Sequence, residues 1–225
     1  MTAAERCGIY TAFNQKYWDR YGARFVAMSE ALSPRPAQLI VVTEVDAEFP
    51  DWWTVVRFWD DRVWPAFDKA LDYATTEWVM LCGVDEQFDP DFFADLPLAG
   101  DVVNVSGRWG NGNACYGTPS QWMNLLDLGH NGMPGLQMIR LEVQRKYPQR
   151  LHKWRDWISW AELRWHGVQA SFDTRQKFVW CYEPGQTSFE ADRAAEMEIL
   201  CFISDLKTGR VIPGPEWPAL LKPEQ

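Results

Sequence analysis

The sequence predicts one α/β domain with a mostly parallel central sheet flanked by helices. Short apolar runs of strand length alternate with helical patterns in the first half of the chain, an alternation that is typical of βαβ units. The chain has 225 residues, enough for one good-sized domain, and its hydrophobic content of 47% is ordinary for a packed globular protein. We therefore expect one domain rather than two small ones.

The chain begins with the pattern of a strand, a helix and a second strand. Cys7 to Phe13 is short and apolar and predicts a strand, and Asn14 to about Leu32 carries apolar residues at helical spacing. Ser33 to Pro36 contains two prolines and ends the helix. Leu39 to Val42 predicts a second strand, which ends at Thr43-Glu44, because a continuous β-branched run suits a buried parallel position.

The most informative segment runs from Lys69 to Phe93. It predicts a short amphipathic helix, a buried strand from Trp78 to Cys82, an acidic loop with Asp85 and Glu86, and a further helical turn that starts at Pro90. Open α/β sheets bind ligands at the edge formed by the carboxyl ends of their strands. Hard cations, and the diphosphates that accompany them, require oxygen ligands of this kind. The segment therefore predicts both a fold class and a site.

The second half of the chain predicts more strands and helices around two glycine-bearing loops. Gly167 follows one of the helical patterns and is a typical helix stop. We expect strands at Asp101 to Ser106, Val168 to Phe172 and Lys177 to Cys181; helices at Leu136 to Tyr147 and Trp154 to His166; one helix, or a helix and a strand, at Phe189 to Leu206; and loops at Gly107 to Gly117 and His130 to Gly135.

Charge and cysteine usage argue against several classes of protein. The net charge of −9 argues against a broad nucleic-acid-binding surface, although Arg140 to Arg155 is locally basic. The five cysteines are scattered and fit neither a disulfide framework nor a zinc site, which predicts a cytoplasmic location. No apolar run approaches the roughly 18 residues of a membrane span, and the first residues lack the pattern of a secretory signal.

Tryptophan is the unusual residue of this composition, with 14 copies. Its flat apolar face and single N–H donor suit stacking on sugar rings or bases. Core packing is the commoner use of any one tryptophan, and Trp154, Trp157 and Trp160 recur at a spacing that favours it. The excess as a whole mildly favours a carbohydrate or nucleotide ligand.

Four motifs resemble those of family 2-type glycosyltransferases, which have the nucleotide-sugar-binding GT-A fold. T-A-F-N, from Thr11 to Asn14, is similar to the Thr/Tyr-Asn turn after the family's first strand, and V-V-T-E ends the second strand in an acidic residue. E-W-V-M-L-C-G-V-D-E, followed by Pro90, resembles the strand that leads to Asp-x-Asp. R-D-W-I-S-W-A-E-L-R-W-H-G resembles the helix that carries Glu-Asp. The resemblance extends from roughly Gly8 to Ser188.

The resemblance implies an enzyme that moves a sugar from a nucleoside-diphosphate sugar to an acceptor hydroxyl, with Mn²⁺ or Mg²⁺ and with inversion. It implies a nucleotide-binding half at 1–106, an acceptor-side half at 107–188, and a C-terminal helix and tail at 189–225. The acceptor would be a glycan or a protein hydroxyl. A modified nucleic-acid base is a lesser option, which would use the basic segment from Arg140 to Arg155.

The same resemblance implies a role for each matching residue. Asp85 would ligate the metal that bridges the donor diphosphate, with Glu86 as its acidic neighbour, and Asp156 would be the general base that deprotonates the acceptor. Glu44 would lie against the base and ribose, beside the backbone of Thr11 to Phe13. The implied nucleotide-sugar-binding residues are Thr11, Phe13, Glu44, Lys69 and Val84.

Departures from the family pattern leave other interpretations open. Gly83 stands where the first Asp of Asp-x-Asp is expected, Arg155 replaces the Glu of Glu-Asp, and only Glu183 is present where a late His is common. A non-catalytic carbohydrate-binding or scaffold domain would tolerate these changes. A nucleotidyltransferase also uses strand-end carboxylates, but its glycine-rich basic loop is not matched by F-N-Q-K-Y-W.

Each candidate residue also has a structural interpretation. Asp85 and Glu86 can be carboxylates of a solvated loop together with Asp89 and Asp91, since loops that precede helices often carry capping residues. A negative charge in the first turn of a helix complements the helix dipole, which would explain Asp156 without catalysis. Lys69 can equally end a solvated helix face.

Overall fold

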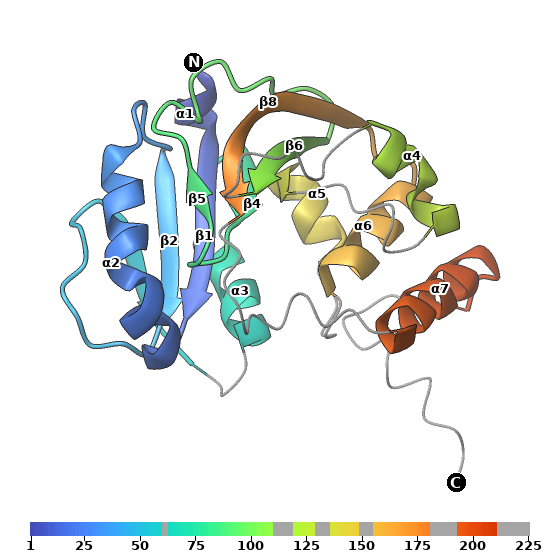
Figure 1. Ribbon diagram of the computed structural model, residues 1–225, viewed down its shortest axis with the longest axis horizontal. Coiled ribbons are helices and arrows are strands. Elements are labelled where there is room, and N and C mark those ends of the chain that lie inside the picture. The colour runs from blue at the N-terminus through green and yellow to red at the C-terminus, as the bar shows by residue number, and fades with distance from the viewer. Residues whose placement is uncertain (60–62, 110–118, 129–135, 149–154, 181–192, 211–225) are drawn as a thin grey trace, which may run out of the picture.

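A computed structural model of the chain describes residues 1–59, 63–109, 119–128, 136–148, 155–180 and 193–210 (Figure 1). In this part of the chain eight strands form one sheet, in the order β3-β2-β1-β4-β7-β6-β8-β5. Four of the seven strand pairings are parallel and three are antiparallel. The prediction of a single α/β domain with a mostly parallel sheet is confirmed.

The first half of the chain forms the parallel part of the sheet. The strands are β1 (Cys7–Phe13), β2 (Gln38–Thr43), β3 (Trp53–Arg57) and β4 (Trp78–Leu81), and the helices between them are α2 (Gln15–Ala31) and α3 (Val63–Leu71). The predicted strands β1, β2 and β4 are confirmed, and so is α2, whose first turn is capped by the side chain of Asn14. Strand β3 lies in a segment for which the sequence predicted no element.

The second half forms the antiparallel and mixed part of the sheet. Its strands are β5 (Gln87–Phe88), β6 (Val102–Trp109), β7 (Leu136–Arg140) and β8 (Ala170–Trp180). Its helices are α4 (Pro119–Leu128), α5 (Leu141–Lys146), α6 (Arg155–Trp165) and α7 (Arg193–Lys207), while a short α1 (Ala3–Arg6) precedes β1. Gly167 follows α6 with φ +71°, which confirms it as the helix stop.

Several predictions for the second half are wrong in detail. The helix predicted over Leu136 to Tyr147 is strand β7 followed by α5, because residues 136–140 pair antiparallel with both β4 and β6. The two predicted late strands are one strand, β8, with Gln176 at φ +58° within it. Residues 107–109 of the first predicted loop extend β6. The rest of that loop and the whole of His130 to Gly135 lie outside the described residues.

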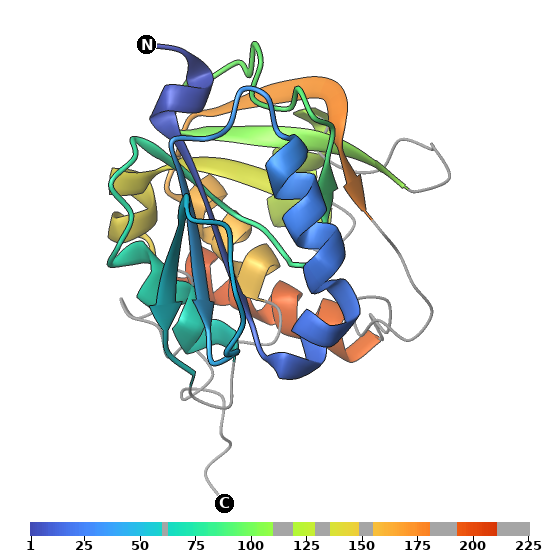
Figure 2. The same cartoon turned by 90° about the vertical axis from the view of Figure 1, so that its left-hand side faces the viewer.

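Helices cover both faces of the sheet. Helix α2 lies over one face, as Figure 2 shows, and buries Phe25 against Ile9 and Val41. Helix α3 covers the opposite face and buries Phe67 against Tyr10 and Val42. Helices α4, α6 and α7 gather on the other side of the molecule from α2 (Figure 1), with α6 packed on both of its neighbours. Thr11, Phe13, Glu44 and the segment Val84 to Glu86 lie at or directly after the carboxyl ends of β1, β2 and β4.

Candidate functional site

The ends of β1 and β2 are joined by a buried threonine. The hydroxyl of Thr43 donates to the carbonyl oxygen of Phe13 at 2.7 Å and accepts from the backbone N–H of Val45 at 3.0 Å. The side chains of Thr11 and Phe13 are both buried, and the Thr11 hydroxyl has no hydrogen-bond partner in the described part of the chain. Glu44, directly after β2, is exposed. This edge therefore presents backbone groups and the Glu44 carboxylate.

An aromatic cluster covers the end of β1. The ring of Phe13 stacks on Trp18 with centroids 5.1 Å apart and lies 6.3 Å from the ring of Phe49. Trp18 is itself held over Gly22, since a Cβ built there would lie 2.5 Å from the indole ring. One face of Phe13 is thus already occupied by protein, and Trp18 and Phe49 are the partly exposed rings at this edge.

The chain after β4 makes a tight acidic turn, which we define as Gly83 to Glu86. The backbone N–H of Glu86 donates to the carbonyl of Gly83 at 3.2 Å, and the Gly83 N–H donates to Oε2 of Glu86 at 2.7 Å. This reciprocal pair resembles a capping box. One carboxylate oxygen of Glu86 is therefore used to close the turn, and Val84 inside the turn is buried in the core.

The carboxylate of Asp85 lies over Gly83. A Cβ built on Gly83 would be only 2.5 Å from Oδ1 of Asp85, so the absence of a side chain at residue 83 makes room for that carboxylate. The negative charge of Asp85 contributes, after burial, to raising the pKa of Tyr17 on α2. Beneath the turn, burial and then Glu86 raise the pKa of the Cys82 thiol. The turn is thus a concentration of negative charge at the carboxyl end of β4.

Helix α2 contributes a residue that the sequence prediction did not include. Nη2 of Arg24 donates to the backbone carbonyl of Asp85 at 2.9 Å. Tyr17, Tyr21 and Arg24 lie at helical spacing along α2, and this periodicity is the signal that places them on one face of the helix.

Lys69 is not brought to the acidic turn in the described structure. Lys69 lies in the last turn of α3, pairs with Asp72 at 2.9 Å, and contacts the ring of Tyr73 at 5.6 Å. Gln38, the first residue of β2, donates to the Tyr73 carbonyl, so Lys69 lies toward the side where the strands begin. Asp156 is the second residue of α6, and its side chain lies outside the described residues.

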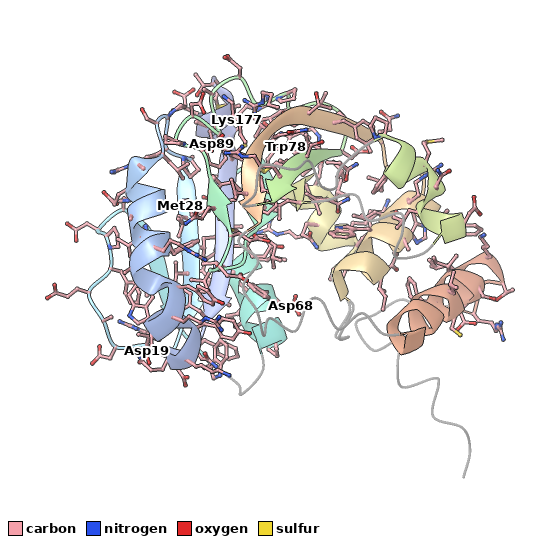
Figure 3. All side chains as sticks on the ribbon, viewed as in Figure 1. Asp19, Met28, Asp68, Trp78, Asp89 and Lys177 are labelled. Carbon is pink, nitrogen blue, oxygen red and sulfur yellow. The ribbon has the colours of Figure 1, made fainter. Side chains whose placement is uncertain are left out.

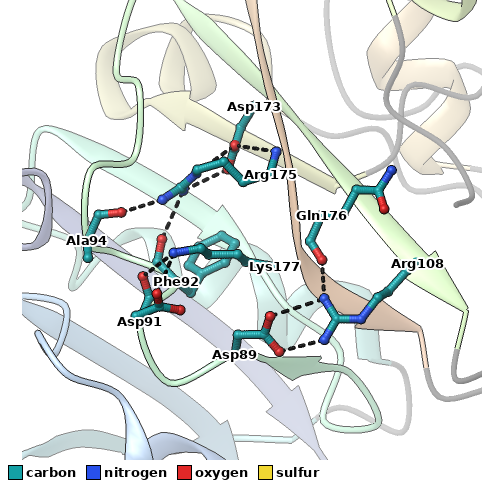
Figure 4. Close-up of polar contacts among 9 residues, drawn as sticks. All are labelled: Asp89, Asp91, Phe92, Ala94, Arg108, Asp173, Arg175, Gln176 and Lys177. Carbon is teal, nitrogen blue, oxygen red and sulfur yellow. Dashed lines mark hydrogen bonds and ion pairs between the residues drawn. The ribbon is translucent and has the colours of Figure 1, made fainter. Parts of the chain in front are cut away.

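Three ion pairs lie where the segment after β5 meets β6 and β8: Asp89–Arg108, Asp91–Lys177 and Asp173–Arg175. We call these six residues the clasp (Figure 4). Asp89 binds Arg108 through both oxygens, at 2.6 and 3.1 Å, and Asp91 accepts from Lys177 at 2.6 Å. Arg175 pairs with the buried Asp173 at 2.8 Å. It also donates to the carbonyl oxygens of Phe92 and Ala94. These contacts tie the segment after β5 to β6 and β8. Figure 3 shows Asp89 and Lys177 at the opposite end of the molecule from Asp19, near the beginning of α2.

Two arginines of the predicted basic segment are engaged in structural contacts. Arg140 pairs with Glu77 at 2.7 Å and lies 4.7 Å from the ring of Trp78. Arg145 donates to the carbonyl oxygens of Leu71 and Ala74. The segment therefore stabilises the start of β4.

The acidic turn is compatible with a divalent cation that is shared with a ligand. Among the described residues no three His, Cys, Asp or Glu side chains come together to form a complete metal cage. Mg²⁺ and similar cations, however, are commonly held by one or two carboxylates together with substrate phosphates and waters. The turn carries two carboxylates, those of Asp85 and Glu86, which is a set of that size.

Comparisons with known proteins support the fold at low sequence identity. No protein-family model and no curated protein matches the sequence. S. aureus TarS 1–349 in complex with UDP-GlcNAc has a TM-score of 0.59 and 11% identity, over 91% of this chain and 73% of that chain. Mannosyltransferase PcManGT from Pyrobaculum calidifontis in complex with GDP-Man and Mn²⁺ has a TM-score of 0.55 and 14% identity, over 93% and 66%.

A Drosophila galactosyltransferase in complex with manganese, UDP-Gal and xylobiose is also similar, with a TM-score of 0.51 and 11% identity, over 86% of this chain and 79% of that chain. In another TarS structure the chain spans 37% of the length of the protein. These similarities show that the chain has a GT-A-type fold. Within the described ranges, none of the helices combines the length and the apolar character needed to cross a bilayer.

Proposed function

We propose that this chain is a glycosyltransferase that moves a sugar from a nucleoside-diphosphate sugar to an acceptor hydroxyl, with Mn²⁺ or Mg²⁺ and with inversion. The observation that carries the proposal is the position of Asp85, which follows β4 at the carboxyl edge of a GT-A-type sheet. Ligands of open α/β sheets bind at this edge. Structures with a similar fold are complexes with UDP-GlcNAc, UDP-Gal and manganese, or GDP-Man and Mn²⁺.

The donor would lie along the edge from β2 to β4. Glu44 is exposed at the end of β2 and would contact the base and ribose, beside the backbone of Thr11 to Phe13. The diphosphate would lie by the acidic turn, where the backbone of Val84 adjoins Asp85. Residues 1–106 would thus form the nucleotide-binding half and residues 107–188 the acceptor side. Lys69 has no part in this arrangement, because it lies toward the other edge of the sheet.

The chemistry requires few residues. A divalent cation, when bound, neutralises charge on the departing nucleoside diphosphate. Asp85 would hold that cation against the diphosphate. Asp156 would take the proton of the acceptor hydroxyl while the acceptor oxygen bonds to the anomeric carbon and the bond from that carbon to the diphosphate oxygen breaks. Attack from the face opposite the leaving group inverts the configuration. We propose a glycan or a protein hydroxyl as the acceptor.

A non-catalytic carbohydrate-binding domain is the second candidate. The observation that favours it is the small number of carboxylate oxygens at the acidic turn, since residue 83 is glycine and Glu86 uses one oxygen to close the turn. Such a domain would bind sugars without metal-dependent binding of nucleotides, which separates it experimentally from the transferase.

A panel of nucleotide sugars tests the proposal. Thermal shift and donor hydrolysis are measured with UDP- and GDP-linked sugars, with and without Mn²⁺, and we expect metal-dependent stabilisation by at least one donor. If no nucleoside diphosphate stabilises the protein in a metal-dependent way, the transferase proposal is refuted. Stabilisation by free glycans alone would favour the second candidate.

The role of Asp156 is tested within the same panel. Asp156→Asn should abolish transfer while donor affinity stays nearly unchanged, because a base acts on the acceptor and not on the donor. Glu142→Gln is the matched control, since Glu142 is the second residue of α5 as Asp156 is of α6. Equal losses of activity in the two variants, or loss of donor binding in Asp156→Asn, would contradict a base role.

A further inference from the structure

Arg24 of helix α2 contacts the acidic turn. Nη2 of Arg24 donates to the Asp85 carbonyl at 2.9 Å, and the guanidinium of Arg24 lies 5.1 Å from the ring centroid of Tyr21. Tyr21 is only 2% exposed, so its ring is a fixed platform for the guanidinium. Arg20 lies 5.1 Å from the same ring centroid. The Tyr21 ring and the Asp85 carbonyl together fix the position of the Arg24 guanidinium.

The bonds within the acidic turn determine its shape but not its position. The Gly83 and Glu86 contacts close the turn on itself. Val84 anchors the turn in the core below, while the bond from Arg24 to the Asp85 carbonyl connects it to α2. A hydrogen bond with an ionised donor is about twice as strong as a neutral one. This bond, together with the buried Val84, therefore fixes Asp85 relative to the helix.

We propose that Arg24 is a positioning residue, which holds the acidic turn so that the Asp85 carboxylate is presented to a divalent cation. The inference rests on the proposed function and deepens it by assigning a supporting residue to the cation site. The benefit comes from geometry, since the positive charge of Arg24 by itself opposes a nearby cation. Helix α2 begins directly after β1. The same helix therefore connects the end of the donor site that would hold the nucleotide base with the end that would hold the cation.

Titration with Mn²⁺ in the presence of UDP or GDP tests this role, with free Mn²⁺ measured by electron paramagnetic resonance. Arg24→Met keeps the length of the side chain but removes its donors, and we expect about tenfold weaker Mn²⁺ binding, as is typical when a partner of a metal ligand is lost. Arg24→Lys retains a donor and should restore most of the affinity. Arg35→Met is the matched control, because it also loses a guanidinium that lies 5.1 Å from an aromatic ring centroid, that of Trp52, and its affinity should stay within about twofold of wild type, below the range for such partners.

Melting temperatures are recorded for the same variants so that a general loss of stability is recognised. If Arg24→Met binds Mn²⁺ as tightly as the wild type, or if Arg35→Met loses as much affinity, the positioning role is refuted while the transferase proposal stands. If the wild type shows no Mn²⁺-dependent binding of UDP or GDP, the proposed function fails and the inference fails with it. The two failures are therefore distinguishable.

Discussion

Two acidic segments flank β5, and their carboxylates are used differently. In the clasp, Asp89 and Asp91 pair with Arg108 and Lys177, and Lys177 lowers the pKa of Asp91. In the acidic turn, the bonds of Glu86 to Gly83 are made with backbone groups, and the Asp85 carboxylate lies over Gly83. The sequence shows four carboxylates within seven residues. In the structure two of them belong to the clasp and two to the candidate ligand site.

The difference between the two segments follows from what each one faces. The clasp lies against β6 and β8, whose arginines and lysine neutralise it within the protein. The acidic turn follows β4 at the carboxyl edge and lies by α2, which anchors it through a backbone carbonyl. The carboxylates of the clasp are thus tied to neighbouring strands, whereas the carboxylates of the acidic turn stand at the carboxyl edge of the sheet.

The largest expected effect is a loss of folding stability when the clasp is broken. Arg175→Met would leave Asp173, which is 1% exposed, as a buried charge that has lost its ion pair, and should lower the free energy of unfolding by about 3 kcal/mol. Urea unfolding measures this change. Lys177→Met is the control, since Asp91 is 59% exposed, and should cost less than about 1 kcal/mol. Equal losses in the two variants would contradict a clasp centred on Asp173.

The next effect compares the carboxylates of the two segments. Loss of a residue that only supports a metal ligand weakens metal affinity by about 10- to 100-fold. Asp85→Asn removes a proposed ligand itself, and it should therefore weaken Mn²⁺-dependent donor binding by about 100-fold or more. Asp89→Asn should leave this binding unchanged and lower stability by about 1 kcal/mol. Calorimetric titration and urea unfolding of both variants check the assignment. An unchanged Mn²⁺ response in Asp85→Asn would remove Asp85 from the metal site.

A smaller effect is expected from crowding Asp85 while retaining it. In Gly83→Ala the new Cβ would lie 2.5 Å from Oδ1 of Asp85, so the carboxylate must move and Mn²⁺ binding should weaken by about tenfold. Stability should change little, because the end of a flexible side chain can shift. Gly8→Ala crowds Thr76 Oγ1 equally, at 2.6 Å, at the other end of β1, and should leave binding intact. Unaltered Mn²⁺ affinity in Gly83→Ala would show that the position of the carboxylate is not critical.

The smallest expected effect is the loss of stability when a surface ion-pair network outside both segments is removed. Arg6, and then Arg140, lower the pKa of Glu77 from 4.5 to about 2. The stabilisation is therefore present above pH 4.5 and is lost as the pH falls towards 2. Glu77→Gln should cost less than about 1 kcal/mol at pH 7, because the pair is partly exposed. This difference from the wild type should shrink at pH 3 in urea unfolding. A constant difference across this range would contradict the ion-pair origin.

Local patterns were sufficient for three of the first four strands, β1, β2 and β4, but not for β3. Strands β1, β2 and β4 are apolar runs bounded by polar residues, and α2 begins at the capping residue Asn14. The acidic turn was predictable because residues that directly follow a parallel strand must lie at its carboxyl edge. The roles of its residues stay predictions, and the side chain of Asp156 lies outside the described structure.

Contacts between distant residues decided the rest. Residues 136–140 have an apolar pattern that suits a helix or a fully buried strand, and antiparallel pairing with β4 and β6 selects the strand. Strand β5 has two residues and exists through its pairing with β8. Lys69 lies in the last turn of α3, and the packing of that helix on the sheet decides its place. None of these outcomes depends on the local sequence alone.

The sequence by itself determined the fold class, the strands β1, β2 and β4, and an acidic segment at the carboxyl edge, because hydrophobic periodicity and capping act within a few residues. Only the tertiary structure decided how its carboxylates are used. Arg24 is 61 residues away from Asp85, and Lys177 is 86 residues away from Asp91. Pairings at such separations depend on how the sheet and α2 come together, and no local pattern records them.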